Sequence, residues 1–234
     1  RANAGMDATM LILAVIAISV PSIFNAAIEP DKLKVEELSV STAVVMLGVY
    51  ALSIIYMLRS KTPETDAGPT IQPSHTAPHW SPRIALAVLA ASVVGIAIMS
   101  EFLVGSIEPV TETLGLSAFF VGIIIIPLIG NVAEHLVAVQ VALKNQMDLS
   151  LSIATGSSLQ IALFVAPILV FISLFMGNPL TLEFNNFELI ALTASAAIAA
   201  FISVDGRSNW LEGAMLLAVY LILGLAFFFL PSLM

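Results

Sequence analysis

The 234-residue sequence contains no cysteine and few charged residues. Without cysteine, this sequence can form no disulfide bond and no thiolate zinc site, so any metal bound by it has to be held by oxygen or imidazole groups. Charged residues make up only 10% of the sequence, and they lie in short gaps between apolar blocks. The net charge of −8 therefore describes loops, and it gives no support to nucleic acid as a partner.

The sequence also lacks the short motifs of common enzymes. It contains no G-x-S-x-G, no H-E-x-x-H, no Walker loop and no G-x-G-x-x-G, which are signals of hydrolases, zinc proteases and nucleotide-binding proteins. An intramembrane enzyme would need a nucleophile paired with a base, and no such pair can be recognised. We therefore predict a protein that is not an enzyme and that uses no cofactor.

Long apolar segments dominate the sequence. Hydrophobic residues make up 59% of it and the mean hydropathy is +1.03, values far outside the range of a soluble domain. Seven stretches reach the roughly 20 residues that an α-helix needs to cross a bilayer. They are residues 7–28, 40–59, 82–104, 116–142, 148–176, 186–203 and 208–230. Since the alternating segments of a membrane barrel are absent, we predict an all-α integral membrane protein with about seven transmembrane helices.

A proline-rich segment, residues 60–81, separates two predicted helices from five and is expected to be an extended linker. Lysine and arginine are concentrated on one side of the predicted membrane, because only Lys32 and Lys34 fall on the other side. The positive-inside rule then predicts that the amino terminus and the linker are cytoplasmic and that the carboxyl terminus is outside. The acidic connection at residues 29–37 is predicted to be solvated, with cation binding there as the alternative.

Three polar residues share one face of the fourth predicted helix. Asn131, Glu134 and His135 stand at i, i+3 and i+4. A charged residue near the middle of a membrane helix costs roughly 2.5 to 3.5 kcal/mol on insertion scales, so it persists chiefly where it faces a cavity or a partner. An ion site is one interpretation, and a hydrogen-bonded knot that only joins helices is the other.

Pro127 and Gly130 precede these polar residues. Such residues allow a membrane helix to bend or unwind, so that freed backbone carbonyls can turn toward an ion. A proline kink without a role in ligand binding is the alternative for Pro127.

A second polar patch begins the fifth predicted helix. Ser157 and Gln160 share a face there, and Ser158 lies beside them. Hydroxyl and amide oxygens near a carboxylate suit a hard cation such as Ca²⁺, although small residues also serve close helix packing. Glu101, inside the third apolar segment, belongs either to an ion path or to the membrane interface.

The segments GNVAEH and KNQMDLSLSIATGSSLQIALF resemble the second signature repeat of the CAX calcium/proton antiporters, within the cation/calcium exchanger superfamily. SEFLVGSIEP before them, DGRSNWLEGAMLLAVYLILGLAFFF after them and the opening NAGMDATMLILAVIAISVPSIF also look like helices of that family. The resemblance implies a fold of about eleven helices, made of one extra helix and two inverted five-helix halves. Residues 1–59 would close the first half, and residues 82–234 would form the second half.

In that family each half supplies a G-N-x-x-E motif, and the two glutamates meet in the membrane. This sequence has one such motif, so we expect it to be part of a longer protein whose amino-terminal repeat half supplies the other glutamate. Pairing with another chain that donates the missing motif is the alternative. We hypothesise that Ca²⁺, as transported substrate, is bound by Glu134, Asn131, Ser157 and Gln160. We also predict a proton-coupling or ion-path role for Glu134, His135, Glu101 and Ser158, and a helix break at Gly130 and Pro127.

The function implied by the resemblance is exchange of cytosolic Ca²⁺ for H⁺ across a membrane, with the plasma (inner) membrane as the expected location. A sodium-coupled cation/calcium exchanger is the first alternative, since it would use a similar repeat. A seven-helix receptor is a remoter alternative, and a retinal protein would require a lysine within a membrane helix, which is lacking. Besides the lipid bilayer, a second copy of the chain is an open alternative as partner.

Overall fold

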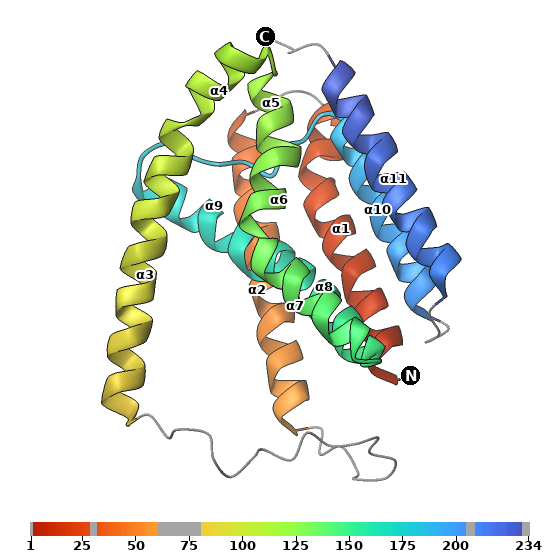
Figure 1. The fold of residues 1–234 in the computed structure, drawn as a ribbon. Coiled ribbons are helices and arrows are strands. Elements are labelled where there is room, and N and C mark those ends of the chain that lie inside the picture. The colour runs from red at the N-terminus through yellow and green to blue at the C-terminus, as the bar shows by residue number, and fades with distance from the viewer. Residues whose placement is uncertain (1, 29–31, 60–80, 205–208, 231–234) are drawn as a thin grey trace. The chain divides into compact units, whose positions relative to one another are not determined.

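The computed structural model describes residues 2–28, 32–59, 81–204 and 209–230. All regular secondary structure within these ranges is helical (Figure 1). Within these ranges, six helices are long and apolar enough to cross a membrane, and a bent pair, Ala118–Gly130 with Val132–Leu143, makes seven when it is counted as one span. The predicted all-α membrane architecture with about seven spans is therefore confirmed.

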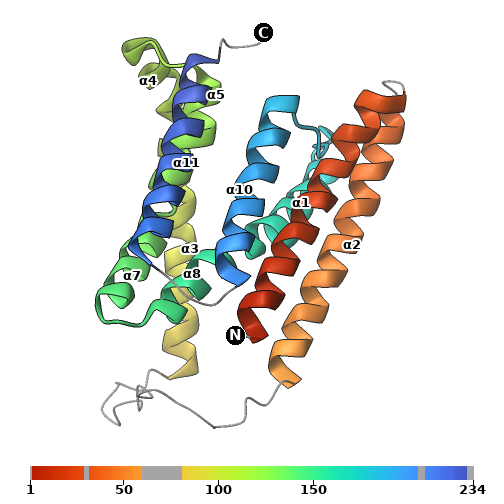
Figure 2. The same cartoon turned by 90° about the vertical axis from the view of Figure 1, so that its right-hand side faces the viewer.

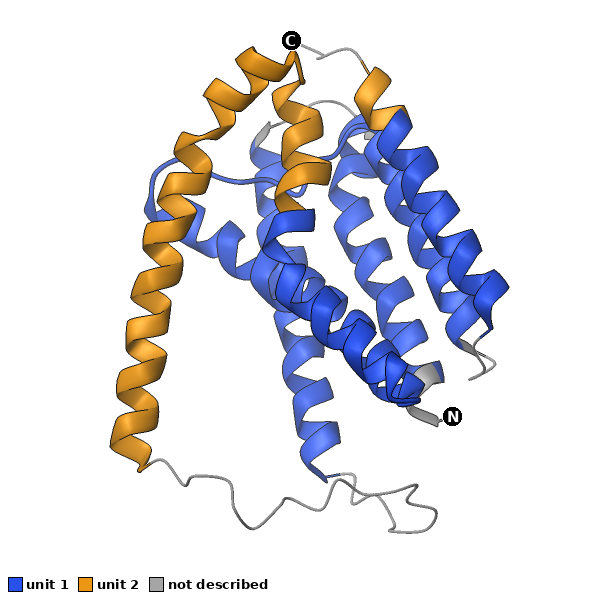
Figure 3. Cartoon of the chain, in the orientation of Figure 1, with its two compact units in different colours: residues 1–60, 128–225 blue, residues 61–127, 226–234 orange. Residues whose placement is uncertain are grey.

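The chain forms two compact units (Figure 3). Unit 1 comprises residues 1–60 and 128–225, and unit 2 comprises residues 61–127 and 226–234. Unit 1 contains α1 (Ala2–Ile28), α2 (Lys32–Arg59), α7 (Val132–Leu143), α8 (Met147–Gln160), the π-helical turn η2 (Ile161–Val165), α9 (Ala166–Phe175), α10 (Asn186–Val204) and most of α11 (Trp210–Phe229). These units reflect packing, so the predicted division into repeat halves stays a prediction. Residues 60–80 of the predicted linker lie outside the described residues.

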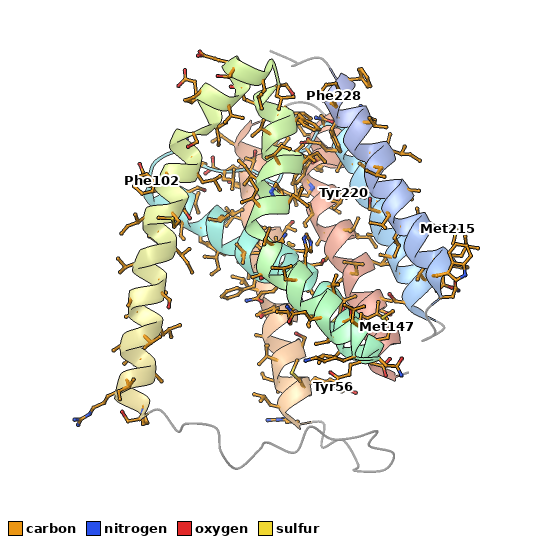
Figure 4. All side chains as sticks on the ribbon, viewed as in Figure 1. Tyr56, Phe102, Met147, Met215, Tyr220 and Phe228 are labelled. Carbon is orange, nitrogen blue, oxygen red and sulfur yellow. The ribbon has the colours of Figure 1, made fainter. Side chains whose placement is uncertain are left out.

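Unit 2 contains α3 (Pro82–Gly105), α4 (Ile107–Leu114), α5 (Ala118–Phe120), the π-helical turn η1 (Val121–Ile125) and the beginning of α6 (Ile126–Gly130). α3 begins at Pro82 because a proline is favourable in the first helical turn and because the Ser81 hydroxyl accepts a hydrogen bond from the Ile84 N–H at 3.4 Å. None of its residues is buried, and side chains such as Phe102 project from it (Figure 4). α4 ends at Gly115, whose φ of 63° is the left-handed conformation that favours glycine.

α2 begins at Lys32, eight residues before the start that the apolar pattern predicts. The segment from 32 to 39 is charged, but its apolar positions follow the helical period, so that Val35 and Ser39 lie one turn apart on one face. Both side chains are buried, Val35 with 2% and Ser39 with none of its surface exposed. Burial of this face extends the helix through residues that hydropathy alone assigns to a connection.

The core of unit 1 joins the first two helices to the helices that follow the GNVAEH motif. Buried side chains from α1, α2, α8, η2 and α9 meet in one cluster, which also includes Leu182 from the non-helical chain after α9. Tyr50 of α2 stacks on Phe164 of η2, with ring centroids 5.1 Å apart. α1 and α2 therefore position α8, which carries the second predicted polar patch, and η2, which follows it.

α1 also packs along α10, as Figure 2 shows. Alanines are buried on both helices, at Ala8 and Ala14 of α1 and at Ala191, Ala196 and Ala200 of α10. Small side chains allow helix backbones to approach closely, which is the main source of helix association in lipid. α1 is consequently the helix around which α2, α8 and α10 are arranged.

Candidate functional site

The polypeptide bends at the start of the GNVAEH motif helix. The axes of Ala118–Gly130 and Val132–Leu143 form an angle of 52°. Between them Asn131 has φ −98° and ψ 13°, outside the α-helical region, and its carbonyl accepts the His135 N–H at 3.0 Å. Asn131 thus ends one helix and begins α7, and its side-chain oxygen is not used as a cap within the described structure.

A π-helical turn precedes this bend. In η1 the Ile126 N–H bonds to the Val121 carbonyl, five residues back. Proline cannot donate a hydrogen bond, and in an α-helix its ring clashes with the carbonyl four residues earlier. A wider turn before Pro127 changes the position of that carbonyl. Pro127 therefore lies in a distorted stretch of chain that leads directly to Asn131.

The same arrangement occurs on the second polar segment. In η2 the Ala166 N–H bonds to the Ile161 carbonyl, and Pro167 follows. Both π turns thus start six residues before a proline. π turns inside α-helices are frequent at functional sites. The sequence analysis did not single out Pro167, although a proline inside an apolar run, as at Pro127, was the available signal.

α7 and α8 form an antiparallel helical hairpin. Its turn is closed by Asn145, whose φ of 61° is left-handed, and Met147, labelled in Figure 4, begins α8. Glu134 lies ten residues before Lys144, and Ser157 lies eleven residues after Gln146, so the two are at nearly the same height on neighbouring helices. At 1.5 Å per residue this height is about 15 Å from the turn, half of a 30 Å hydrocarbon layer.

Glu134 lies in the first turn of α7. The partial positive charge at a helix amino terminus favours a carboxylate there. Glu134 and His135 are exposed, and neither side chain has a hydrogen bond or ion pair within the described ranges. The carboxylate oxygens are therefore free, in this part of the chain, to bind a cation or a proton.

The hydroxyls on α8 are oriented by their own helix. Thr155 Oγ1 donates to the Leu151 carbonyl at 2.9 Å, and Ser158 Oγ donates to the Ala154 carbonyl at 2.9 Å. A hydroxyl that donates its proton to the backbone keeps lone pairs for a cation. Ser157 is half-buried, whereas Gln160 is exposed. The two predicted ligand segments thus lie on adjacent helices and offer carboxylate, amide and hydroxyl oxygens, the groups that suit Ca²⁺.

Glu101 lies on α3 in unit 2, where its side chain is exposed, and its predicted role in an ion path stays a prediction. Within the described residues no three His, Asp or Glu side chains come together in a way that could hold a metal ion. The proposed ligands on α7 and α8 include one carboxylate, Glu134, together with neutral oxygens.

The space around Gly130 would accommodate a larger side chain. A Cβ atom built on it meets no atom within 4 Å, and its φ is not positive. We expect Gly130→Ala to fold normally and to slow ion transport by about fivefold, because Gly130 ends α6 and alanine there favours helical over unwound backbone by about 1 kcal/mol. Gly48→Ala in α2, where the added Cβ also meets nothing, is the matched control. Equal transport rates in the two variants would show that Gly130 has no part in the bend.

Comparison with known proteins assigns the family. Residues 84–229 match the family described as sodium/calcium exchanger protein. The chain belongs to this family. It is 45% identical over 241 residues to the Ca(2+)/H(+) antiporter of Aphanothece halophytica, covering 97% of this chain and 65% of that protein. It is 43% identical to the Ca(2+)/H(+) antiporter of Synechocystis, covering 98% of this chain and 66% of that protein.

A solved structure, that of the Ca2+/H+ antiporter protein YfkE, superimposes with a TM-score of 0.79 at 34% identity, covering 97% of this chain and 65% of that chain. The chain thus spans just under two thirds of the length of these relatives. The resemblance to the exchanger superfamily is confirmed, and the alternative of a seven-helix receptor is wrong for a member of this family. The matched region includes all the predicted site residues, from Glu101 to Gln160.

Proposed function

We propose that this chain carries the second half of the ion site of an antiporter that exchanges cytosolic Ca²⁺ for H⁺. The observation that carries the proposal is the position of Glu134. Its carboxylate lies in the first turn of the helix that follows a 52° break, near the height of Ser157 on the adjacent helix. The two relatives compared above are Ca(2+)/H(+) antiporters by name and support the choice of ions.

In the proposed mechanism one site serves both ions in turn. Ionised Glu134, with a second glutamate from the amino-terminal repeat half of the intact protein, binds Ca²⁺ from the cytoplasm. Asn131, Ser157 and Gln160 complete the coordination with neutral oxygens, which Ca²⁺ accepts in irregular geometry. His135 accepts or donates a proton beside the carboxylate.

Coupling follows from competition. Protonation removes the negative charge that holds Ca²⁺, and bound Ca²⁺ in turn opposes protonation, because both ions use the same carboxylate oxygens. The proposed exchange needs no ATP and no covalent intermediate. The two relatives named above are antiporters, which supports a transporter rather than an enzyme.

The chain is an integral membrane protein. We infer further that it resides in the plasma (inner) membrane with the amino terminus and the linker in the cytoplasm. Helix packing supports the alternation of loops in this topology. The chain after α9 contacts α1 near its carboxyl end and α2 near its amino end, so these two helix ends and the chain after α9, which the topology assigns to one side, lie together.

The test determines which ion gradient drives Ca²⁺ uptake. The intact gene product is reconstituted in proteoliposomes, and Ca²⁺ uptake is measured with an imposed pH gradient or with an imposed Na⁺ gradient at equal pH. Uptake that follows the pH gradient and needs no Na⁺ is expected. Uptake driven by Na⁺ alone would support the sodium-coupled exchanger instead and would reject proton exchange.

A further inference from the structure

A short non-helical segment after α9 is bound by three serines from three helices. The backbone N–H groups of Leu180, Leu182 and Phe184 donate to the hydroxyl oxygens of Ser173 in α9, Ser39 in α2 and Ser22 in α1, at 2.7, 3.1 and 2.8 Å. The donors are alternate residues, as in an extended chain whose N–H groups point to one side. We call residues 180–184 the strap; it lies in the cyan trace between α9 and α10 in Figure 1.

The serines replace the partners that a β-sheet would supply. Ser22 also donates to the Leu182 carbonyl at 3.2 Å, and Ser173 donates to the Val170 carbonyl at 2.7 Å. Ser22 lies six residues before the end of α1, which is about 9 Å along the helix. A backbone at such a depth in a membrane protein needs internal partners, because lipid provides none. Ser22 and Ser39 are themselves buried.

A polar contact also ties the exposed edge of the strap to α1. The Asn25 side-chain amide donates to Glu183 Oε1, while the other carboxylate oxygen, Oε2, accepts from Thr181 at 3.5 Å. The strap is therefore attached to α1 at two points, at Ser22 and at Asn25, and to α2 and α9 at one point each.

The strap is connected to the candidate ion site through the core. Leu182 is buried in the cluster that contains Leu159 and Leu163. These two leucines lie one turn apart on a single face, and Gln160 stands about 100° around the helix from Leu159. A fixed position of Leu159 consequently fixes the direction in which Gln160 and its neighbour Ser158 leave the helix.

We propose that Ser22, Ser39 and Ser173 are positioning residues for ion binding, which hold the strap on α1, α2 and α9 and thereby fix the rotation of α8 about its axis. The strap stays bound to α1, α2 and α9 throughout the transport cycle. This inference rests on the proposed function, since it concerns the affinity of that same site for Ca²⁺.

The first test compares two double variants of the intact gene product in proteoliposome uptake. Ser22→Ala with Ser39→Ala removes both hydroxyls and leaves two strap N–H groups without their acceptors. It is expected to raise the KM for Ca²⁺ by up to about tenfold, which is part of the cost of leaving two buried N–H groups without acceptors, with little change in the maximal rate. Ser22→Thr with Ser39→Thr keeps both hydroxyls and is expected to retain the native KM. An unchanged KM in the alanine variant would overturn the proposal, and so would equal changes in both variants.

The second test asks whether the strap opens during transport. The sequence has no cysteine, so Asn25→Cys with Glu183→Cys introduces a single pair of thiols into this chain. A short bis-thiol reagent should join them, and transport by the cross-linked protein should continue at the rate of the unlinked variant. Cross-linking in the alanine background should also lower the raised KM. Loss of transport on cross-linking would show that the strap has to open.

Hydrogen exchange separates failure of this inference from failure of the proposed function. In the native protein the amides of Leu180, Leu182 and Phe184 should be protected, and the alanine variant should lose protection at Leu182 and Phe184 whether or not Ca²⁺ is transported. A protected strap in a native protein that transports no Ca²⁺ would reject the function and leave the strap geometry intact. Rapid exchange of these amides in the native protein would reject the strap itself.

Discussion

Glu134→Gln is expected to abolish proton-driven Ca²⁺ uptake, with a loss of at least about a hundredfold. Glutamine keeps the size and one oxygen of glutamate but removes the charge that Ca²⁺ and H⁺ share. In the proposed site of the intact protein, the Glu134 carboxylate and Ca²⁺ form a charge pair inside the membrane. Removing one partner of a buried charge pair costs about 3 to 5 kcal/mol, and 3 kcal/mol is more than a hundredfold in affinity. The measurement is initial Ca²⁺ uptake into proteoliposomes under an imposed pH gradient.

Glu37→Gln is the matched control for this variant. Glu37 is a carboxylate on the exposed surface of α2, and its backbone carbonyl, not its side chain, accepts a hydrogen bond from Ser41. Uptake by the control should equal that of the native protein. Retention of uptake by Glu134→Gln, with both variants incorporated at equal density, would remove Glu134 from the ion site and leave it as a residue that only joins helices.

Leu163→Ala is expected to cause the largest loss of stability among single substitutions in unit 1. Leu163 has no exposed surface and lies where α1, α2, α8, η2 and α9 meet. Replacing a buried leucine by alanine costs about 2 to 5 kcal/mol, because atoms are removed and a cavity remains. The residue also belongs to η2, so its loss loosens the turn that follows Gln160. The measurement is the midpoint of thermal unfolding in detergent, followed by size-exclusion chromatography.

Ile161→Ala, two residues earlier in the same π turn, separates core packing from local helix formation. Ile161 is 53% exposed within the described structure, so shortening its side chain removes fewer packing contacts than shortening that of Leu163. A small effect is expected there. Equal losses in the two variants would mean that the turn, and not the core, determines the stability.

The number of spans and the polar motifs could be predicted from the sequence, whereas the contacts that hold unit 1 together could not. Apolar length identifies membrane helices because lipid permits only helices or closed barrels. The same criterion placed the start of α2 too late, since the charges near Lys32 outweigh Val35 in a hydropathy window although burial decides the helix. Glu134 and Ser157 are at a similar height on α7 and α8 because they are about equally far in sequence from the turn at Asn145, and this distance can be read from the sequence.

The strap could not be predicted for a different reason. Serines such as Ser22 and Ser39 are common in membrane helices as small packing residues, so they do not indicate a special role. Their partners lie 162 and 143 residues away in the sequence. A contact between residues so far apart leaves no local periodic pattern in the sequence from which it could be predicted. The roles of Asn131, Glu134, His135, Ser157 and Gln160 stay predictions, because the structure shows their positions and the transport assays are needed to show what they bind.

The two π turns have a consequence for how sequences of this kind should be aligned. A turn closed by a bond to the fifth residue back contains one residue more than an α-helical turn. A chain with one residue fewer between Val121 and Ile125, or between Ile161 and Val165, could therefore continue as an α-helix with the flanking side chains on unchanged faces. A single-residue gap at either place would then mark a straighter helix rather than a shifted register, and a substitution of Pro127 or Pro167 should accompany it.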